Sequence, residues 1–159
     1  YKRQQERCCF SMAQDKKQVV EDLNLQLSNF TVLWTKIHNY HWYVKGHNFF
    51  ALHEKFEELY NKVAVYVDEI AERALALEGN PVGKMSEVLE VSSIEEAEYG
   101  ISAEKMVAQL ATDFETVVKE LKVAQGNAEE AGDDRSADMF IEIATELEHN
   151  IWMLKAYIG

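Results

Sequence analysis

The stretch KIHNYHWYVKGHNFFALHEKFEELY, residues 36–60, decides how this chain folds. It holds four of the five histidines and a break, Val44–Asn48, between two segments with helical periodicity. Gly46 suits a left-handed helix end, and a connection this short makes the two helices antiparallel neighbours. His41 and His53 stand about equally far before and after the break. We therefore expect their imidazoles to face each other.

The second of these segments predicts an amphipathic helix, because apolar residues recur every three or four positions from residue 49 to 77. At about 100° per residue, another face of this helix carries His53, Glu57, Asp68 and Glu72. At about 1.5 Å rise per residue, His53 and Glu72 stand some 28 Å apart. One straight helix cannot bring both ends of this face to a single ion.

Two copies of the helix, packed antiparallel around a twofold axis near residues 62–63, would remove this difficulty. His53 would then lie opposite Glu72, and Glu57 opposite Asp68. A twofold interface is self-complementary, so it would hold two identical sites, each built from both chains. The sequence therefore predicts a metal site that one chain cannot complete.

The remaining pattern predicts an all-α fold of four long helices. We expect them at about residues 15–44, 49–78, 103–131 and 134–158, with Gly79-Asn80-Pro81 ending the second, Ser102 capping the third and Gly132-Asp133-Asp134 capping the fourth. Between the second and third, within residues 82–101, the piece MSEVLEV and the start signals Ser92/Ser93 with Glu95/Glu96 predict a short helix or two. This is a ferritin-like four-helix bundle with one crossover connection.

Composition limits the alternatives. A chain of 159 residues, 47% of them hydrophobic, predicts one domain with a substantial core. No apolar run approaches the length of a membrane span, and no apolar signal core stands near the start, so a cytoplasmic location is expected. The net charge of −12 disfavours bulk affinity for nucleic acid and suits attraction of cations.

The first residues differ from the rest. Residues 1–17 carry five basic and two acidic side chains, and residues 1–11 show no helical stripe. We interpret residues 1–14 as a basic tail or extension, with Met12 a possible natural start, and residues 15–159 as the domain. A basic tail can contact DNA, although a solvated terminus is the simpler interpretation.

These motifs resemble the Dps family, the small ferritin-like proteins of bacteria. The resemblance covers about residues 17–158 and is densest at His41-Trp42, Lys45-Gly46, Asn48-Phe49-Phe50, Leu52-His53-Glu54 and Asp68-Glu69-Ile70-Ala71-Glu72-Arg73. It implies a dodecamer built from twofold dimers. It also implies a ferroxidase that oxidises Fe(II) with hydrogen peroxide, and more slowly with oxygen, storing the ferric mineral inside and protecting DNA.

The resemblance also implies which residues bind iron. Carried over by position, the ligands are His41, His53 and Glu57 of one chain with Asp68 and Glu72 of its mate. The family usually has Asp where this chain has Glu57, and the longer side chain would shift the second metal position. Acidic residues around the last helix turn would line threefold pores for iron entry, namely Glu129, Asp134 and Asp138. Without the family, helix capping and solvation explain these three equally well.

Other interpretations stay open. The histidines could be buried interface residues with salt-bridged carboxylates, and the chain could be a nucleoid protein that compacts DNA through its basic tail. A 24-subunit ferritin is a weaker option, because the acidic face lies off the core. The pair Glu146 and His149 matches one half of a di-iron motif, but the other half is missing. Trp42 can pack against the site or intercept radicals, and we favour packing.

Overall fold

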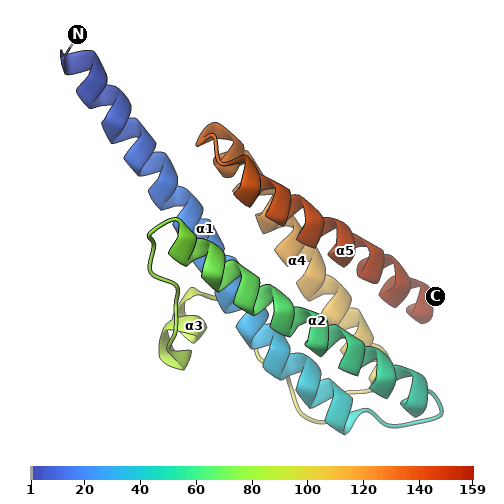
Figure 1. Ribbon diagram of the computed structural model, residues 1–159. Helices are drawn as coiled ribbons and strands as arrows, with labels where there is room; N and C mark the ends of the chain where they lie inside the picture. The colour runs from blue at the N-terminus through green and yellow to red at the C-terminus, as the bar shows by residue number, and fades with distance from the viewer. Residues whose placement is uncertain (1) are drawn as a thin grey trace.

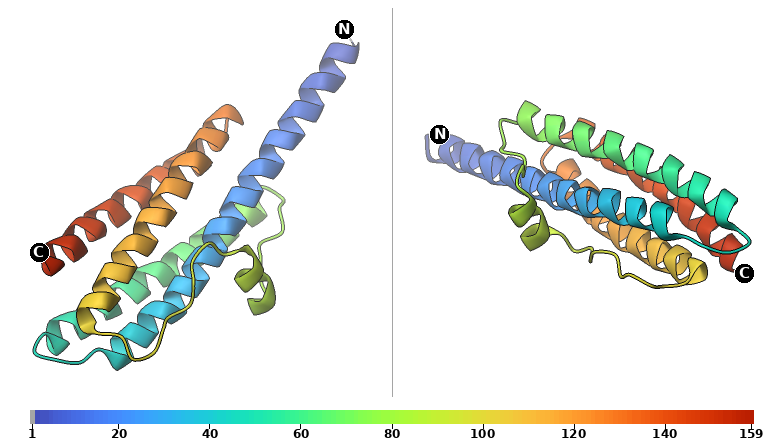
Figure 2. Two further views of the ribbon diagram at one scale, coloured as in Figure 1. Left: turned by 180° about the vertical axis from the view of Figure 1, so that it is seen from behind. Right: turned by 90° about the horizontal axis from the view of Figure 1, so that it is seen from below.

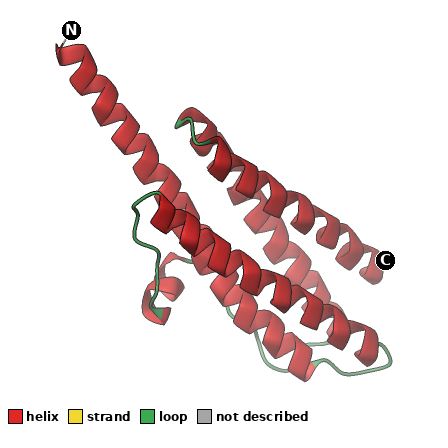
Figure 3. Cartoon of the chain, viewed as in Figure 1, coloured by secondary structure: helices red, strands yellow, loops and turns green. Residues whose placement is uncertain are grey.

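The computed structural model describes residues 2–159, with side chains from residue 13 onward. It consists of four long helices and one short helix (Figure 1), which are α1 (Lys2–Tyr43), α2 (Phe49–Ala76), α3 (Met85–Val91), α4 (Ala103–Glu130) and α5 (Asp134–Ile158). All described secondary structure is helical (Figure 3). The predicted ferritin-like bundle, with a short helix between the second and third long helices, is confirmed.

The start of α1 differs from the prediction. The helix begins at Lys2 rather than near Asp15, and its first turns extend beyond the other helices (Figure 1). The segment YKRQQERCCFS has no apolar stripe, but it also has no proline or glycine, and its Arg, Gln, Glu and Lys residues favour helix. The composition is therefore compatible with a helix, and α1 continues upstream of the core.

The long helices pack as two antiparallel hairpins, α1 with α2 and α4 with α5 (Figure 2). Their core is built around large side chains with no exposed surface, from every long helix: Phe30, Tyr40, Phe56, Phe114 and Phe140. Burying each of the phenylalanines stabilises the fold by about 1.5–3 kcal/mol. The bundle is therefore held mainly by apolar packing, as the helical stripes predicted.

α2 ends just before Gly79-Asn80-Pro81, as the sequence predicted. The helix stops at Ala76, and Gly79 then passes so close to α1 that a Cβ on it would lie 2.6 Å from a methyl of Val20. Pro81 follows and cannot continue a helix. The glycine is needed here for space, because any side chain would push α1 and the end of α2 apart.

The crossover contains α3 and an irregular segment from residue 92 to 102 (Figure 3). A second short helix, predicted from Ser92 and Ser93, does not form. The Oδ1 atom of Asn29 accepts hydrogen bonds from Ser92 Oγ at 3.0 Å and Ser93 N at 2.8 Å. Ser92 and Ser93, which were predicted to start a helix, instead bind the crossover to α1.

The seam between the two hairpins carries buried polar pairs. The Lys36 Nζ atom lies 2.8 Å from Asp113 Oδ2, and both side chains are more than nine-tenths buried. Lys36 also donates to the Glu95 carbonyl at 2.8 Å. Nearby, Asn29 Nδ2 donates to Glu120 Oε2 at 2.8 Å. α1 is thus tied to α4 and to the crossover at fixed points along its length.

No helix within residues 2–159 combines the length and the apolar character that crossing a membrane requires.

Candidate metal centre

His41 and His53 lie against each other across the α1–α2 hairpin. Their ring centroids are 3.6 Å apart and the ring planes are 14° from parallel. His41 is 8% exposed and His53 is half-buried. The sequence placed these two imidazoles on opposite sides of a tight break, and the structure brings them together.

The hydrogen bonds of the two rings fix their tautomers. His41 Nδ1 is 2.7 Å from the carbonyl oxygen of His53, and His53 Nδ1 is 2.7 Å from the carbonyl oxygen of His41. A carbonyl only accepts, so each Nδ1 must carry the proton and donate it. In the neutral rings both Nε2 atoms therefore keep a free lone pair, which is the form that binds a metal.

The turn between the helices positions this pair. Gly46 has φ +108°, a conformation that residues with a side chain rarely adopt. Asn48 donates from Nδ2 to the Tyr157 hydroxyl at 2.8 Å, which ties the turn to the end of α5. The ring of Phe49 stacks on His53 with centroids 4.9 Å apart. The imidazoles are thus held by a turn that is itself anchored.

The acidic residues predicted as ligands lie along the exposed side of α2. Glu57 is one turn beyond His53, while Asp68 and Glu72 lie further along, and all three are exposed. Within the described residues of a single chain, no three His, Cys, Asp or Glu side chains gather closely enough to hold a metal. One chain brings two of the five predicted ligands together.

An aromatic cluster covers the side of the histidine pair. The Tyr60 ring stacks on His38 with centroids 3.7 Å apart and meets His41 edge-on at 5.3 Å. Trp34 is 42% exposed, and its ring centroid lies 4.3 Å from that of His38. Trp42 is 66% exposed and contacts His38 at 5.3 Å between centroids.

The sequence interpretation assigned no role to Tyr60. Its hydroxyl donates to Glu57 Oε1 at 3.2 Å. Partial burial, followed by the charge and hydrogen bond of Glu57, raises the pKa of Tyr60. The three-residue spacing between Glu57 and Tyr60 could have predicted this contact, since residues three apart on a helix are neighbours.

The acidic turn between α4 and α5 is built around a cap. Asp133 accepts from Ser136 N at 3.1 Å and from Arg73 Nη2 at 2.7 Å. Burial alone would raise the pKa of Asp133, but the hydrogen bonds from Ser136 and the charge of Arg73 outweigh it and hold the pKa below its ordinary value. The cap is therefore Asp133.

The three residues predicted to line a pore surround this cap. Glu129, Asp134 and Asp138 are all exposed, before and after the turn. Gln125 donates to Glu129 Oε1 at 2.8 Å. Because none of the three is the capping residue, their carboxylates remain available to attract cations.

The remaining histidines show ordinary roles. His38 Nδ1 donates to the Trp34 carbonyl at 2.7 Å, and His47 is exposed in the turn. His149 is also exposed, and its neighbour Glu146 pairs with Lys62 at 3.0 Å and accepts from the Tyr66 hydroxyl. Glu146, one member of this half-motif, thus links α5 to α2.

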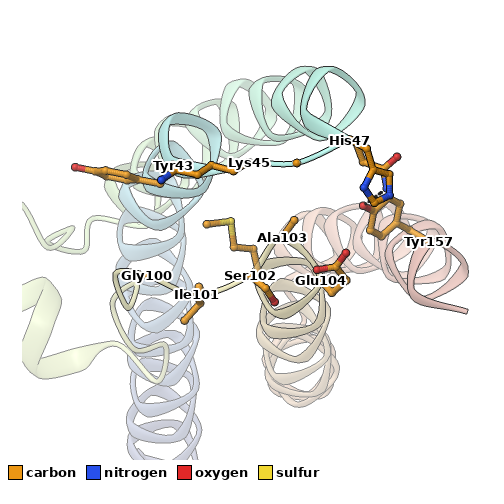
Figure 4. A pocket seen from close by; sticks show the side chains of 12 residues that line it. Tyr43, Lys45, His47, Gly100, Ile101, Ser102, Ala103, Glu104 and Tyr157 are labelled. Atoms are coloured by element: carbon orange, nitrogen blue, oxygen red, sulfur yellow. Dashed lines mark hydrogen bonds between the residues drawn. The ribbon is translucent and has the colours of Figure 1, made fainter.

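A separate pocket of about 510 Å³ opens at the end of the bundle, where the α1–α2 turn meets the start of α4 (Figure 4). Lys45 and His47 lie on one side of it, Ser102 and Glu104 on another, and Tyr157 closes one end. None of the five predicted ligands lines this pocket. The histidine pair, rather than this hollow, is the candidate site.

Comparison with known proteins identifies the family. The ferritin family, described as a ferritin-like domain, matches residues 20–159. DNA protection during starvation protein 2 of Bacillus anthracis is 52% identical over 143 residues, which cover 90% of this chain and 98% of that one. The chain belongs to the Dps family. General stress protein 20U of Bacillus subtilis is 49% identical, over 90% of this chain and 99% of its own length.

Solved Dps structures superpose closely. Dps from Staphylococcus aureus, 55% identical, gives a TM-score of 0.88 over 89% of this chain and 95% of that one. Dps from Bacillus brevis, 45% identical, gives 0.91 over 92% and 98%. The resemblance noted from the sequence motifs is therefore confirmed across nearly the whole Dps fold.

Proposed function

We propose that twelve copies of this chain assemble in the cytoplasm into a hollow shell that oxidises Fe(II) with hydrogen peroxide and stores the ferric mineral inside. The observation that carries this proposal is the histidine pair. Both Nε2 lone pairs are free, and the hairpin that holds them presents Glu57, Asp68 and Glu72 on its open side. Membership of the Dps family supports the same activity.

The ligand set suits the reaction. Imidazole nitrogen and carboxylate oxygen together bind Fe(II), and carboxylate oxygen holds Fe(III) once it forms. Two Fe(II) ions at one site supply two electrons to one hydrogen peroxide, which takes up two protons and leaves as two waters. A paired transfer avoids release of hydroxyl radical, which a single electron would produce.

The other half of each site comes from a second chain in this proposal. Asp68 and Glu72 of the twofold mate approach the histidines, as the antiparallel register of α2 predicts. One Dps from Listeria innocua was solved with two histidines, twelve positions apart, replaced by glycine. His41 and His53 have the same spacing, which supports their assignment as the functional pair.

The decisive test is anaerobic loading with Fe(II) followed by peroxide, with particle mass recorded throughout. We expect particles of twelve chains, two Fe(II) oxidised per peroxide and iron retained in the particle. Particles of twenty-four chains would favour an ordinary ferritin. Assembled particles that bind no Fe(II) and do not accelerate its oxidation would reject the proposed activity.

Direct DNA binding is a second candidate, because several relatives are named for DNA protection during starvation. Protection can come from removing iron and peroxide or from coating DNA. The net charge of −12 favours the first route, and the basic residues within positions 1–17 favour the second. A gel-shift assay with and without residues 1–11, over a range of salt concentrations, separates them, since phosphate contacts weaken steeply with salt.

A further inference from the structure

Tyr60 connects the aromatic cluster to the acidic face of the candidate site. Its ring lies on His38 with centroids 3.7 Å apart and planes 19° from parallel, and it meets His41 edge-on. Its hydroxyl donates to Glu57 Oε1 at 3.2 Å. One side chain therefore contacts both the imidazole side and the carboxylate side of the site.

The Tyr60 ring is held by its stacking on His38. His38 is fixed by donation from Nδ1 to the Trp34 carbonyl at 2.7 Å, and the Trp34 ring lies 4.3 Å from it on another side. Stacking on a fixed imidazole restricts the ring of Tyr60, and α2 fixes its backbone. The hydroxyl is consequently a donor with a defined position.

Glu57 needs such a donor. It is exposed on α2, and a glutamate side chain turns about several bonds, so its carboxylate samples many positions in water. Among residues 13–159, the Tyr60 hydroxyl is the one side-chain group that hydrogen-bonds Glu57, and no ion pair there includes it. The bond to Oε1 leaves Oε2 free.

We propose that Tyr60 is a positioning residue, whose hydroxyl restricts the Glu57 carboxylate on the face of α2 that carries His53, so that its free oxygen reaches Fe(II) once the metal is bound by the histidines. This inference rests on the proposed ferroxidase function. Partners of this kind, bonded to a ligand rather than to the metal, orient the ligand, and losing one typically costs 10–100-fold in metal affinity or activity.

The test replaces Tyr60 by phenylalanine, which keeps the stacked ring and removes the hydroxyl. We expect the Fe(II) concentration that gives half-maximal oxidation rate to rise about tenfold, the lower end of that range because the bond is long and partly exposed. The maximal rate should change much less, and particle mass should not change. Tyr99→Phe is the matched control, because it removes the same atom from an exposed tyrosine.

A double substitution decides whether Tyr60 acts through Glu57. In a Glu57→Ala background, Tyr60→Phe should produce no further change, because the group it positions is gone. An equal effect in both backgrounds would overturn the proposal, as would a Tyr60→Phe variant that matches the wild type. Binding of Co(II), measured without peroxide, should weaken in parallel.

These results separate the two proposals. A wild-type shell that oxidises Fe(II), slowed by Glu57→Ala but not by Tyr60→Phe, rejects the role of Tyr60 and keeps the ferroxidase. A wild-type shell that is slowed by neither variant also rejects the inference, since Glu57 then has no role to support. A wild-type shell without oxidation rejects the ferroxidase and this inference with it.

Discussion

His41 and His53 each donate a hydrogen bond of 2.7 Å from Nδ1 to the backbone carbonyl of the other. The reciprocal bonds fix both tautomers and both ring orientations before any metal arrives. They also use backbone carbonyls of the two helices, so the hairpin and the ligands are positioned by the same contacts. A metal that binds this pair needs little rearrangement of the protein.

Removal of a single ligand should slow iron oxidation without disturbing the shell. We expect His41→Ala or Asp68→Ala to lower the oxidation rate by more than about tenfold. Asp68 is exposed, so its loss should leave the fold intact, and particle mass measures assembly. Rates equal to wild type in both variants would contradict the assigned site.

Mixing the two inactive variants tests whether the sites are shared. In a mixed dimer, one site has His41 from one chain and Asp68 from the other, both intact, while the second site lacks both. Random pairing should therefore restore about one quarter of the sites. Particles reassembled from either variant alone provide the baseline. Mixed particles without recovered oxidation would contradict ligand sharing.

The acidic turn should accelerate iron entry. Replacing Asp134 and Asp138 by asparagine should slow oxidation about threefold to tenfold at low salt, and less at high salt, because the field that draws cations inward is screened. Glu87→Gln with Glu90→Gln on α3 removes the same charge elsewhere. If that control slows oxidation equally, net charge rather than the turn is responsible.

The cap at the start of α5 should be sensitive to acid. The pKa of Asp133 is lowered in the fold, so its carboxylate stabilises the protein above its ordinary pKa of 3.8, and this contribution disappears as the pH falls through the lower folded value. Asp133→Asn should cost about 1–2 kcal/mol at neutral pH and progressively less below pH 3.8. Urea unfolding of both proteins at several pH values measures the difference.

The buried pair on the seam should respond differently to single and double substitution. Asp113→Ala leaves Lys36 charged and buried without its partner, which we expect to cost about 3–5 kcal/mol. Lys36→Met combined with Asp113→Leu should recover most of that loss, because two apolar side chains need no partner. A double variant as unstable as the single one would show that the charge itself is required.

The sequence was sufficient for much of the fold and for the two histidines of the candidate site. Strong periodicity located α2, and the short break placed His41 against His53. Ser102 was predicted as a helix cap, and in the structure it accepts from Lys105 N. These features depend on residues close together in the chain. Local spacing determines them, so a pattern is enough.

Features that depend on distant partners were missed. Lys36 pairs with Asp113 on another hairpin, and nothing near either residue marks the other. Ser92 read as a helix start, but Asn29 of α1 engages it. The early start of α1 was missed for a different reason, because residues 1–11 carry no apolar stripe although their composition favours a helix.

The polar pairs on the seam also control how the two hairpins align. Apolar contacts are non-directional, so one apolar contact can replace another at similar cost when two helices shift along each other. A slip of one turn, about 5.4 Å, would leave Lys36 and Asp113 charged and separated in a dry interior. The buried charged pair therefore disfavours misaligned docking of the two hairpins. Hydrophobic collapse alone does not provide this specificity.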